Sequence, residues 1–333
     1  MYILNNRTNP NKLEEVSFKS LNMKESDIEE MLRKNIDMLC DDDYSMLVVG
    51  QQVCNAQNGR SDLTAIDSNG DMVLIEIKRD KQDILHRKEA FEFQAIRYAA
   101  SCASIRSIDD LVQDVFAPYV EKNKSEYKDI GELTSSEYAK RLLNDFLKTN
   151  QISPESFNHS QRIMLVASEF DEQTLSAVAW LNKNNVDISC YEIRIYKHDD
   201  NVLIDLDKIL PLLEWNDFFV DLKHGTAKNI VQTDISRRSL PKIDKMIEWG
   251  VVKAGDIITP INHDEEAVLL ANGNVEYDGK QMSLQQWLKQ IFDWQSVATY
   301  ASSVHKETGR TLSDLREEYM NKQIADNDDD GQE

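Results

Sequence analysis

The hydrophobic pattern at the start of the chain predicts one helix followed by a buried strand. Apolar residues recur at helical spacing in the stretch "SDIEEMLRKNIDMLC", at Ile28, Met31, Leu32 and Ile36. Ser26 opens this stretch and is a residue type that favours the N-cap of a helix. The run "SMLVVGQQV" at residues 45–53 is mostly apolar and is typical of a buried strand.

The next two strands are expected to form a hairpin. The segments "DLTAID" at 62–67 and "DMVLIEIK" at 71–78 alternate or run apolar, and they flank Asn69-Gly70, a strong signal for a two-residue turn. From Gln82 to about Ser104 the pattern becomes helical again. Its apolar stripe consists of Ile84, Phe91, Ala95, Tyr98 and Cys102. The chain is therefore predicted to begin as helix, three strands, helix.

The pattern after residue 105 predicts a helical insertion, further sheet and then a second unit. Two helices are expected within 106–158, and the segments 162–168, 171–185, 187–197 and 201–210 read as strand, helix, strand and strand. This order indicates that a layered α/β sheet continues. From about Leu240 a smaller α+β unit is expected. Its helices are predicted at 242–250, 283–292 and 311–320 and its strands at 266–273 and 274–279.

Length and composition agree with a globular protein of two domains. A chain of 333 residues is longer than most single cores, and it has 41% hydrophobic and 29% charged residues. No apolar run approaches the roughly 20 residues that span a bilayer, and "MYILNNRTNPNKLEE" lacks the layout of a secretory signal. We therefore expect a cytoplasmic protein with no membrane partner. Its four cysteines, Cys40, Cys54, Cys102 and Cys190, are expected to be reduced core thiols without zinc.

The net charge of −21 argues against a simple basic nucleic-acid-binding protein. The ending "DNDDDGQE" carries five of the acids, so residues 323–333 are expected to form a disordered tail. Residues 222–245 instead hold six Lys or Arg residues against two Asp, a local charge of +4. A basic linker at 213–239, including Arg237 and Arg238, is therefore expected to contact phosphates.

Charged residues interrupt the apolar strand at 71–78. Because side chains alternate along a strand, Leu74, Glu76 and Lys78 share one face, and the hairpin brings Asp62 alongside. Asp62, Glu76 and the backbone carbonyl of Ile77 form a set of hard oxygen ligands that suits Mg²⁺ or Mn²⁺. A bound metal would lower the pKa of a water and stabilise a pentavalent phosphate, and Lys78 could orient that water or neutralise developing charge.

A simpler interpretation is that Glu76 and Lys78 form an ordinary ion pair at a strand end. For an isolated "EIK" this interpretation is favoured, because such short matches are common. The context shifts the balance towards a metal site.

The site residues resemble those of the PD-(D/E)XK nuclease superfamily. Ser61-Asp62 stands in the place of Pro-Asp, Glu76-Ile77-Lys78 is the E-x-K, and "QAIRY" matches the QxxxY element of exonuclease-type members. The stretches "EEMLRKN", "GRSDLTAID", "VLIEIKRD" and "RIMLVASEFDEQTLSAVAWLNKNNVDI" look like nuclease domains related to the archaeal NucS endonuclease. This similarity covers roughly residues 25–210. It implies a restriction-endonuclease-like core, a mixed sheet flanked by helices, at 1–212.

The resemblance also implies roles for individual residues. Metal-binding or catalytic roles carry over to Glu29, Asp62, Glu76 and Lys78, and supporting roles to Gln94 and Tyr98. Glu29 is preferred to its neighbour Glu30 because it fits the family's E-x-x-L-x-x-N spacing; it could hold the metal's water shell or a second ion. Arg60, Arg79 and Lys81 flank the site and are either phosphate contacts or ordinary surface charge.

The C-terminal unit at 240–322 looks like the RAMA-type domain often found beside restriction enzymes. The resemblance rests on Gly250 to Asp256, "ANG" with "YDGK", Ser283 and "TLSDLR", although Trp287 stands where a small residue is expected. Such domains are proposed to recognise modified bases. Trp287, Trp294 and Tyr300 could stack on a base, yet at helical spacing two of the three are expected in the core. Arg310 and Arg316 could bind phosphate or pair with nearby acids.

Together these features favour a metal-dependent DNA endonuclease of the restriction or phage-defence kind, guided by its C-terminal domain. Three alternatives stay open: a non-cleaving DNA-binding protein that uses the nuclease fold as a scaffold, a nuclease that acts on RNA, and a structural or interaction protein. Many nucleases of this kind dimerise to cut both strands, so a homodimer is also compatible with the resemblance.

Overall fold

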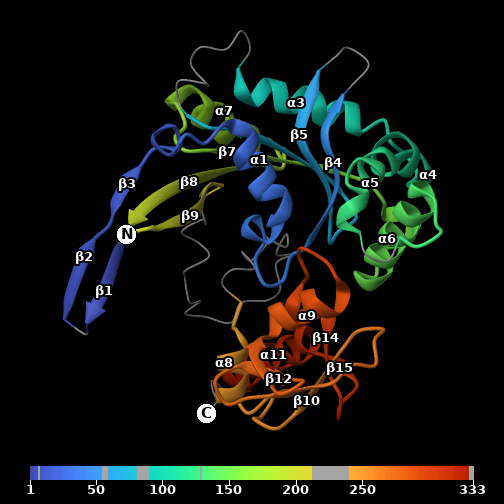
Figure 1. Ribbon diagram of the computed structural model, residues 1–333. Coiled ribbons are helices and arrows are strands. Elements are labelled where there is room, and N and C mark those ends of the chain that lie inside the picture. The colour runs from blue at the N-terminus through green and yellow to red at the C-terminus, as the bar shows by residue number, and fades with distance from the viewer. Residues whose placement is uncertain (7, 55–58, 81–89, 128–129, 212–239, 330–333) are drawn as a thin grey trace. The chain divides into compact units, whose positions relative to one another are not determined.

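The computed structural model describes residues 1–6, 8–54, 59–80, 90–127, 130–211 and 240–329, and the chain forms two compact units (Figure 1). Unit 1 consists of Met1–Leu39, Val48–Asn144 and Ser153–Leu212. Unit 2 consists of Cys40–Leu47, Asp145–Ile152 and Leu213–Glu333. Two short segments that the sequence analysis placed in the first domain therefore belong to unit 2.

A mixed sheet forms the centre of unit 1, in the order β4-β5-β6-β7-β8, with β9 and β3 both pairing with β8. The pairs β5/β6, β8/β9 and β3/β8 are antiparallel, and β6/β7 and β7/β8 are parallel. The strands are β3 (Glu14–Val16), β4 (Met46–Cys54), β5 (Arg60–Asp67), β6 (Met72–Lys78), β7 (Gln161–Ala167), β8 (Ile188–His198) and β9 (Asn201–Leu210). The predicted mixed α/β sheet is confirmed in this coarse form.

The turn between β5 and β6 differs from the predicted two-residue turn. Ile66 pairs with Met72, Asp67 donates its backbone N–H to the carbonyl of Asp71 at 3.0 Å, and Gly70 donates to the carbonyl of Asp67 at 2.9 Å. The connection is thus a three-residue loop, and its last residue, Gly70, has φ of 85°. Only a residue without Cβ adopts this conformation readily, so the glycine signal identified the turn while leaving its length open.

Helices cover the sheet. The helices of this layer are α1 (Glu25–Lys34), α3 (Phe91–Cys102) and α7 (Glu172–Lys183). Leu74 of β6 shares a buried core with Phe91 and Ala95 of α3, Val178 of α7 and Leu165 of β7. Helix α1 packs against β5 and β6. Glu76 and Lys78, at the charged end of β6, are both buried.

Helix α1 begins two residues before the predicted start. Its N-cap is Lys24 instead of Ser26, and Asp27 accepts the backbone N–H of Lys24 at 2.7 Å. A carboxylate three residues into a helix satisfies a free N–H there, which explains why the cap does not need the serine. Short 3-10 helices flank α1, namely η1 (Phe18–Leu21) and η2 (Ile36–Leu39).

The helical insertion lies beside β4 (Figure 1). It comprises α4 (Ile108–Leu111), the π-helical turn η3 (Val112–Phe116), α5 (Ala117–Lys122), η4 (Lys124–Glu126), α6 (Ser135–Thr149) and η5 (Pro154–Ser156). Gly50 of β4 allows a close approach here, because a Cβ at this position would lie 2.9 Å from the side chain of Val115.

The N-terminal residues form a two-stranded sheet that the sequence analysis did not predict. Strand β1 (Tyr2–Asn6) pairs antiparallel with β2 (Asn9–Lys12). The side chains described in β2 are exposed, so the segment lacks the alternation of apolar and polar residues by which strands are recognised.

Unit 2 contains a six-stranded sheet among the described residues, in the order β13-β12-β11-β10-β14-β15. The strands are β10 (Ile257–Pro260), β11 (Ala267–Leu269), β12 (Asn274–Tyr277), β13 (Lys280–Ser283), β14 (Ser303–His305) and β15 (Arg310–Thr311). The helices are α8 (Ile243–Glu248), α9 (Leu284–Phe292), α10 (Thr299–Ser302) and α11 (Leu312–Asp329). The predicted second unit of helices and strands is present.

The aromatic residues and arginines singled out in unit 2 have structural contacts. Trp287 and Tyr300 are buried in its core, and Trp294 is partly buried against it. Arg316 is buried and pairs with Asp43 at 2.6 Å. Arg310 pairs with Glu318 on α11. These contacts agree with the core and ion-pair interpretations.

Of the four cysteines only Cys190 is buried, while Cys54 is exposed and Cys40 and Cys102 are half-buried, so the expectation of four core thiols is wrong.

Helix α11 continues to Asp329, into the predicted tail, because no glycine or proline interrupts it before Gly331. The basic linker, with Arg237 and Arg238, lies outside the described residues, as do Lys81 and Ile84. Across the described ranges, no helix has the length and apolar character needed to cross a membrane.

Candidate functional site

The hairpin register brings Asp62 and Glu76 together. Leu63 pairs with Ile75 and Thr64 with Leu74, so the next position along the ladder places Asp62 opposite Glu76. Both residues are buried. Since a buried carboxylate needs a cation or several hydrogen-bond donors, each must find a partner inside the protein.

The partner is the ammonium of Lys78, which is itself only 1% exposed. Its Nζ contacts a carboxylate oxygen from each of three residues: Glu25 at 3.2 Å, Asp62 at 3.4 Å and Glu76 at 3.5 Å. It also donates to the carbonyl of Ile77, and it lies 5.5 Å from the centre of the Phe91 ring. The simple Glu76–Lys78 ion pair therefore exists, but as part of a larger cluster of oxygens around one cation.

Other donors fix the two buried carboxylates. Asp62 Oδ2 accepts the backbone N–H of Ile77 at 2.8 Å, and Glu76 Oε1 accepts the amide of Gln94 at 2.5 Å. The same Gln94 amide lies 3.4 Å from the hydroxyl of Tyr98, which accepts the backbone N–H of Arg60 at 2.7 Å. The predicted supporting pair on α3 thus contacts the site, since Gln94 orients Glu76 and Tyr98 holds the start of β5.

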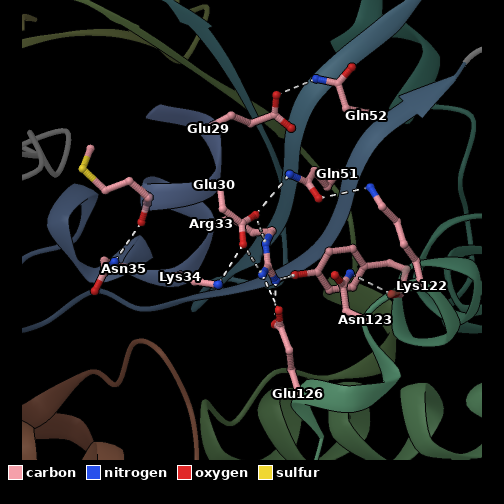
Figure 2. Close-up of polar contacts among 12 residues, drawn as sticks. Glu29, Glu30, Arg33, Lys34, Asn35, Gln51, Gln52, Lys122, Asn123 and Glu126 are labelled. Carbon is pink, nitrogen blue, oxygen red and sulfur yellow. Dashed lines mark hydrogen bonds and ion pairs between the residues drawn. The ribbon is translucent and has the colours of Figure 1, made fainter. Parts of the chain in front are cut away.

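The structure separates Glu29 from Glu30. Glu29 Oε2 accepts the amide of Gln52 at 2.6 Å, and that amide also lies 3.2 Å from Asp62 Oδ1, so Glu29 joins the site through one side chain. Glu30 turns away and pairs with Arg33 at 2.7 Å and Lys34 at 3.0 Å (Figure 2). The geometry therefore associates Glu29, rather than Glu30, with Asp62.

Burial raises the pKa of Glu29 above its ordinary value, and the nearby charge of Asp62 raises it further. Its Oε1 atom is buried and has no hydrogen-bond partner among the described residues. A carboxyl group in this state retains a proton more readily than a surface glutamate. Glu29 therefore places near the site a carboxyl group whose Oε1 atom can accept a further hydrogen bond.

Arg33 ties helix α1 to the insertion. Its guanidinium is buried and contacts Glu30 at 2.7 Å, Glu126 at 2.7 Å and the hydroxyl of Tyr119 at 2.9 Å (Figure 2). The hydrogen bond with Arg33 is the main reason that the pKa of Glu30 falls to about 2. This network fixes the helix that carries Glu25 and Glu29.

Sequence reasoning missed Glu25 and Gln52. Glu25 lies four residues before Glu29, which places both on the same face of α1, and that spacing was an available signal. Gln52 has φ of 55° within β4, an unusual backbone conformation for a residue other than glycine. No pattern in the sequence predicts this conformation.

The three basic residues predicted to flank the site differ in their surroundings. The side chain of Arg60 is exposed at the start of β5, while Arg79 pairs with its neighbour Asp80 at 2.8 Å. Lys81 lies outside the described residues. Arg60 is thus an exposed positive charge beside the cluster.

The oxygen atoms at the site are of the chemical type that a hard divalent cation prefers. Asp62, Glu76 and the Ile77 carbonyl already contact one cationic group, the Lys78 ammonium, and Mg²⁺ prefers a few protein oxygens of this kind. In the described part of the chain, no cluster of three or more His, Cys, Asp or Glu side chains is arranged to hold a metal ion. Two carboxylates and one carbonyl are the ligands this site could offer.

Comparisons of the chain with protein-family models, with curated proteins and with solved structures find no match.

Proposed function

We propose that this protein is a metal-dependent phosphodiester hydrolase of the PD-(D/E)XK type that cleaves DNA. The observation that supports the proposal is the convergence of Asp62, Glu76 and the Ile77 carbonyl on a single cationic group at the end of β6. Such a buried cluster of charges is unfavourable for folding alone, and charged groups of this kind gather at functional sites.

In this proposal Asp62 and Glu76 bind Mg²⁺ or Mn²⁺ together with the Ile77 carbonyl. The bound ion would lower the pKa of a water and stabilise the negative charge that develops on a phosphate. The backbone N–H of Ile77 and the Gln94 amide hold the two carboxylates in place, so that little rearrangement is needed when a ligand binds.

Lys78 supplies the positive charge. Its ammonium is a compact donor on a flexible stem, buried where water screens charge weakly. At this position it can donate a hydrogen bond from Nζ to a phosphate oxygen or orient a water molecule. Glu29, whose pKa is raised, adds a carboxyl group that can hold a proton or a bridging water beside Asp62.

DNA is the proposed substrate, and unit 2 is proposed to guide the enzyme to DNA of a given modification state, as in restriction or phage defence. The exposed Arg60 offers a phosphate contact next to the cluster. Nothing in a site for metal and phosphate distinguishes DNA from RNA, so an RNA substrate is one outcome of the test.

One observation favours a second candidate, a non-cleaving DNA-binding protein. The Lys78 ammonium by itself neutralises part of the charge on Glu25, Asp62 and Glu76. A cluster that is already paired could serve as a structural element of a scaffold. The two candidates differ in whether cleavage depends on Glu76.

A cleavage assay with a matched control separates them. Glu76→Gln keeps the shape of the side chain and removes the charge, while Glu92→Gln makes the same change at a buried carboxylate on α3 that bonds to Thr174 at 3.3 Å. Each protein is incubated with Mg²⁺ or Mn²⁺ and with plasmid DNA, phage-modified DNA or RNA. We expect wild type and Glu92→Gln to cut, and Glu76→Gln to lose at least about 100-fold in rate. Cutting by none of the proteins, or equal cutting by all three, would contradict the proposal.

A further inference from the structure

Glu25 differs from the other two carboxylates that contact Lys78. It comes from the first turn of α1, its side chain is 36% exposed, and its contact with Nζ at 3.2 Å is shorter than those of Asp62 and Glu76. The side chains of Asp62 and Glu76 are 10% and 2% exposed. Glu25 is therefore the acceptor of the ammonium on the solvent side of the cluster.

The three acceptors also differ in their other bonds. Asp62 is fixed by the Ile77 N–H and Gln52, and Glu76 is fixed by Gln94. Within the described part of the chain, the hydrogen bond to the Glu25 carboxylate is the one from Lys78. Glu25 can thus follow the ammonium, whereas the other two carboxylates are held where they are.

We propose that Glu25 is a positioning residue that keeps the Lys78 ammonium when a divalent cation takes Asp62, Glu76 and the Ile77 carbonyl. This inference rests on the metal site of the proposed function. The ammonium contacts the same three oxygen-bearing groups that were assigned to the metal. Lysine and metal therefore compete for one set of ligands.

Electrostatics gives the direction of the exchange. Two cations in a poorly screened cluster repel each other, so the ammonium must shift when the divalent ion binds. The four-carbon stem of Lys78 permits a shift. A carboxylate on the exposed side lowers the free energy of the shifted ammonium. Because the metal can bind only when the ammonium has shifted, Glu25 strengthens metal binding through Lys78. It also keeps the lysine close to the reacting phosphate.

The test is Mn²⁺ binding measured by isothermal titration calorimetry on the full chain without nucleic acid. Four proteins form a double-mutant cycle: wild type, Glu25→Gln, Lys78→Met and the double variant. Glu266→Gln is the matched control, because it removes one carboxylate of similar exposure from an ion pair with Lys306. Circular dichroism of every variant checks the fold.

We expect Glu25→Gln to weaken Mn²⁺ binding by about fivefold, as for the loss of a partly exposed ion pair, and Glu266→Gln to leave it unchanged. Lys78→Met removes the competitor and is expected to tighten binding. In the Lys78→Met background the Glu25 change should alter affinity by less than about twofold.

Three outcomes overturn the inference, and they differ in what they say about the proposed function. If wild type binds Mn²⁺ and Glu25→Gln binds it equally well, Glu25 plays no such role while the metal site stands. If Glu25→Gln weakens binding equally with and without Lys78, Glu25 acts on the metal directly. If neither wild type nor Lys78→Met binds Mn²⁺, the metal site of the proposed function is wrong as well.

Discussion

Replacing Lys78 by methionine should destabilise unit 1 strongly when no divalent cation is present. Methionine keeps the length of the side chain and removes the charge from a position that is 1% exposed. Asp62 and Glu76 would then remain buried without a cation. Breaking a buried ion pair on one side lowers stability by about 3–5 kcal/mol.

The structure places the expected loss near the lower end, at about 3 kcal/mol. Asp62 keeps the Ile77 N–H and Glu76 keeps the Gln94 amide, so each carboxylate retains a hydrogen-bond donor. The matched control is Lys140→Met, whose ammonium is 52% exposed and pairs with Asp109 at 2.7 Å. Exposed pairs of this kind contribute about 0–1 kcal/mol.

The assay is hydrogen exchange of the peptide that covers β6, followed by mass spectrometry at increasing urea in the presence of EDTA. This peptide belongs to unit 1, so it reports the opening free energy of that unit. Equal exchange in Lys78→Met, Lys140→Met and wild type would refute the view that Lys78 neutralises the buried carboxylates.

Three further predictions concern other parts of the chain. Because the pKa of Glu30 is lowered to about 2, its ionised form stabilises the protein fully above its ordinary value of 4.5, and this contribution disappears as pH falls towards 2. Urea unfolding should therefore show wild type about 1 kcal/mol more stable than Glu30→Gln at pH 6 and equally stable near pH 2; the figure is small because solvent screens the half-exposed carboxylate. A difference in unfolding free energy that stays constant with pH would contradict this. Tyr98→Phe should cost about 1 kcal/mol and speed exchange of the Arg60 amide, since the hydroxyl accepts that N–H. Trp287→Ala should lower the stability of unit 2 by about 3–5 kcal/mol in calorimetry, because the side chain is fully buried.

The sequence predicted much of the sheet and half of the site because both follow from alternation along strands. Glu76 and Lys78 are two residues apart, so they had to share a face. The turn signal brought β6 back beside β5, but the predicted two-residue turn would have placed Asp62 opposite Ile77; the three-residue loop sets the register that places it opposite Glu76. The side chains Gln94 and Tyr98 are one helical turn apart, which placed both on one face of α3.

The remainder of the site depends on tertiary contacts. Glu25 and Gln52 reach the cluster from α1 and β4, and the meeting of these elements is set by packing that no local pattern encodes. The N-cap of α1 was misassigned because Asp27 satisfies the N–H of Lys24 from inside the helix. The exposed residues of β2 leave no alternating pattern to detect.

The most direct measurement of the proposed metal site is a crystal structure of the protein soaked in Mn²⁺, with anomalous scattering recorded for the metal. We expect one anomalous peak in contact with the carboxylates of Asp62 and Glu76 and the carbonyl of Ile77. We also expect the Lys78 ammonium to keep its contact with Glu25 and to lose those with Asp62 and Glu76. Crystals at saturating Mn²⁺ that show no peak there, with Lys78 still bound to Asp62 and Glu76, would contradict the assignment of this cluster as a metal site.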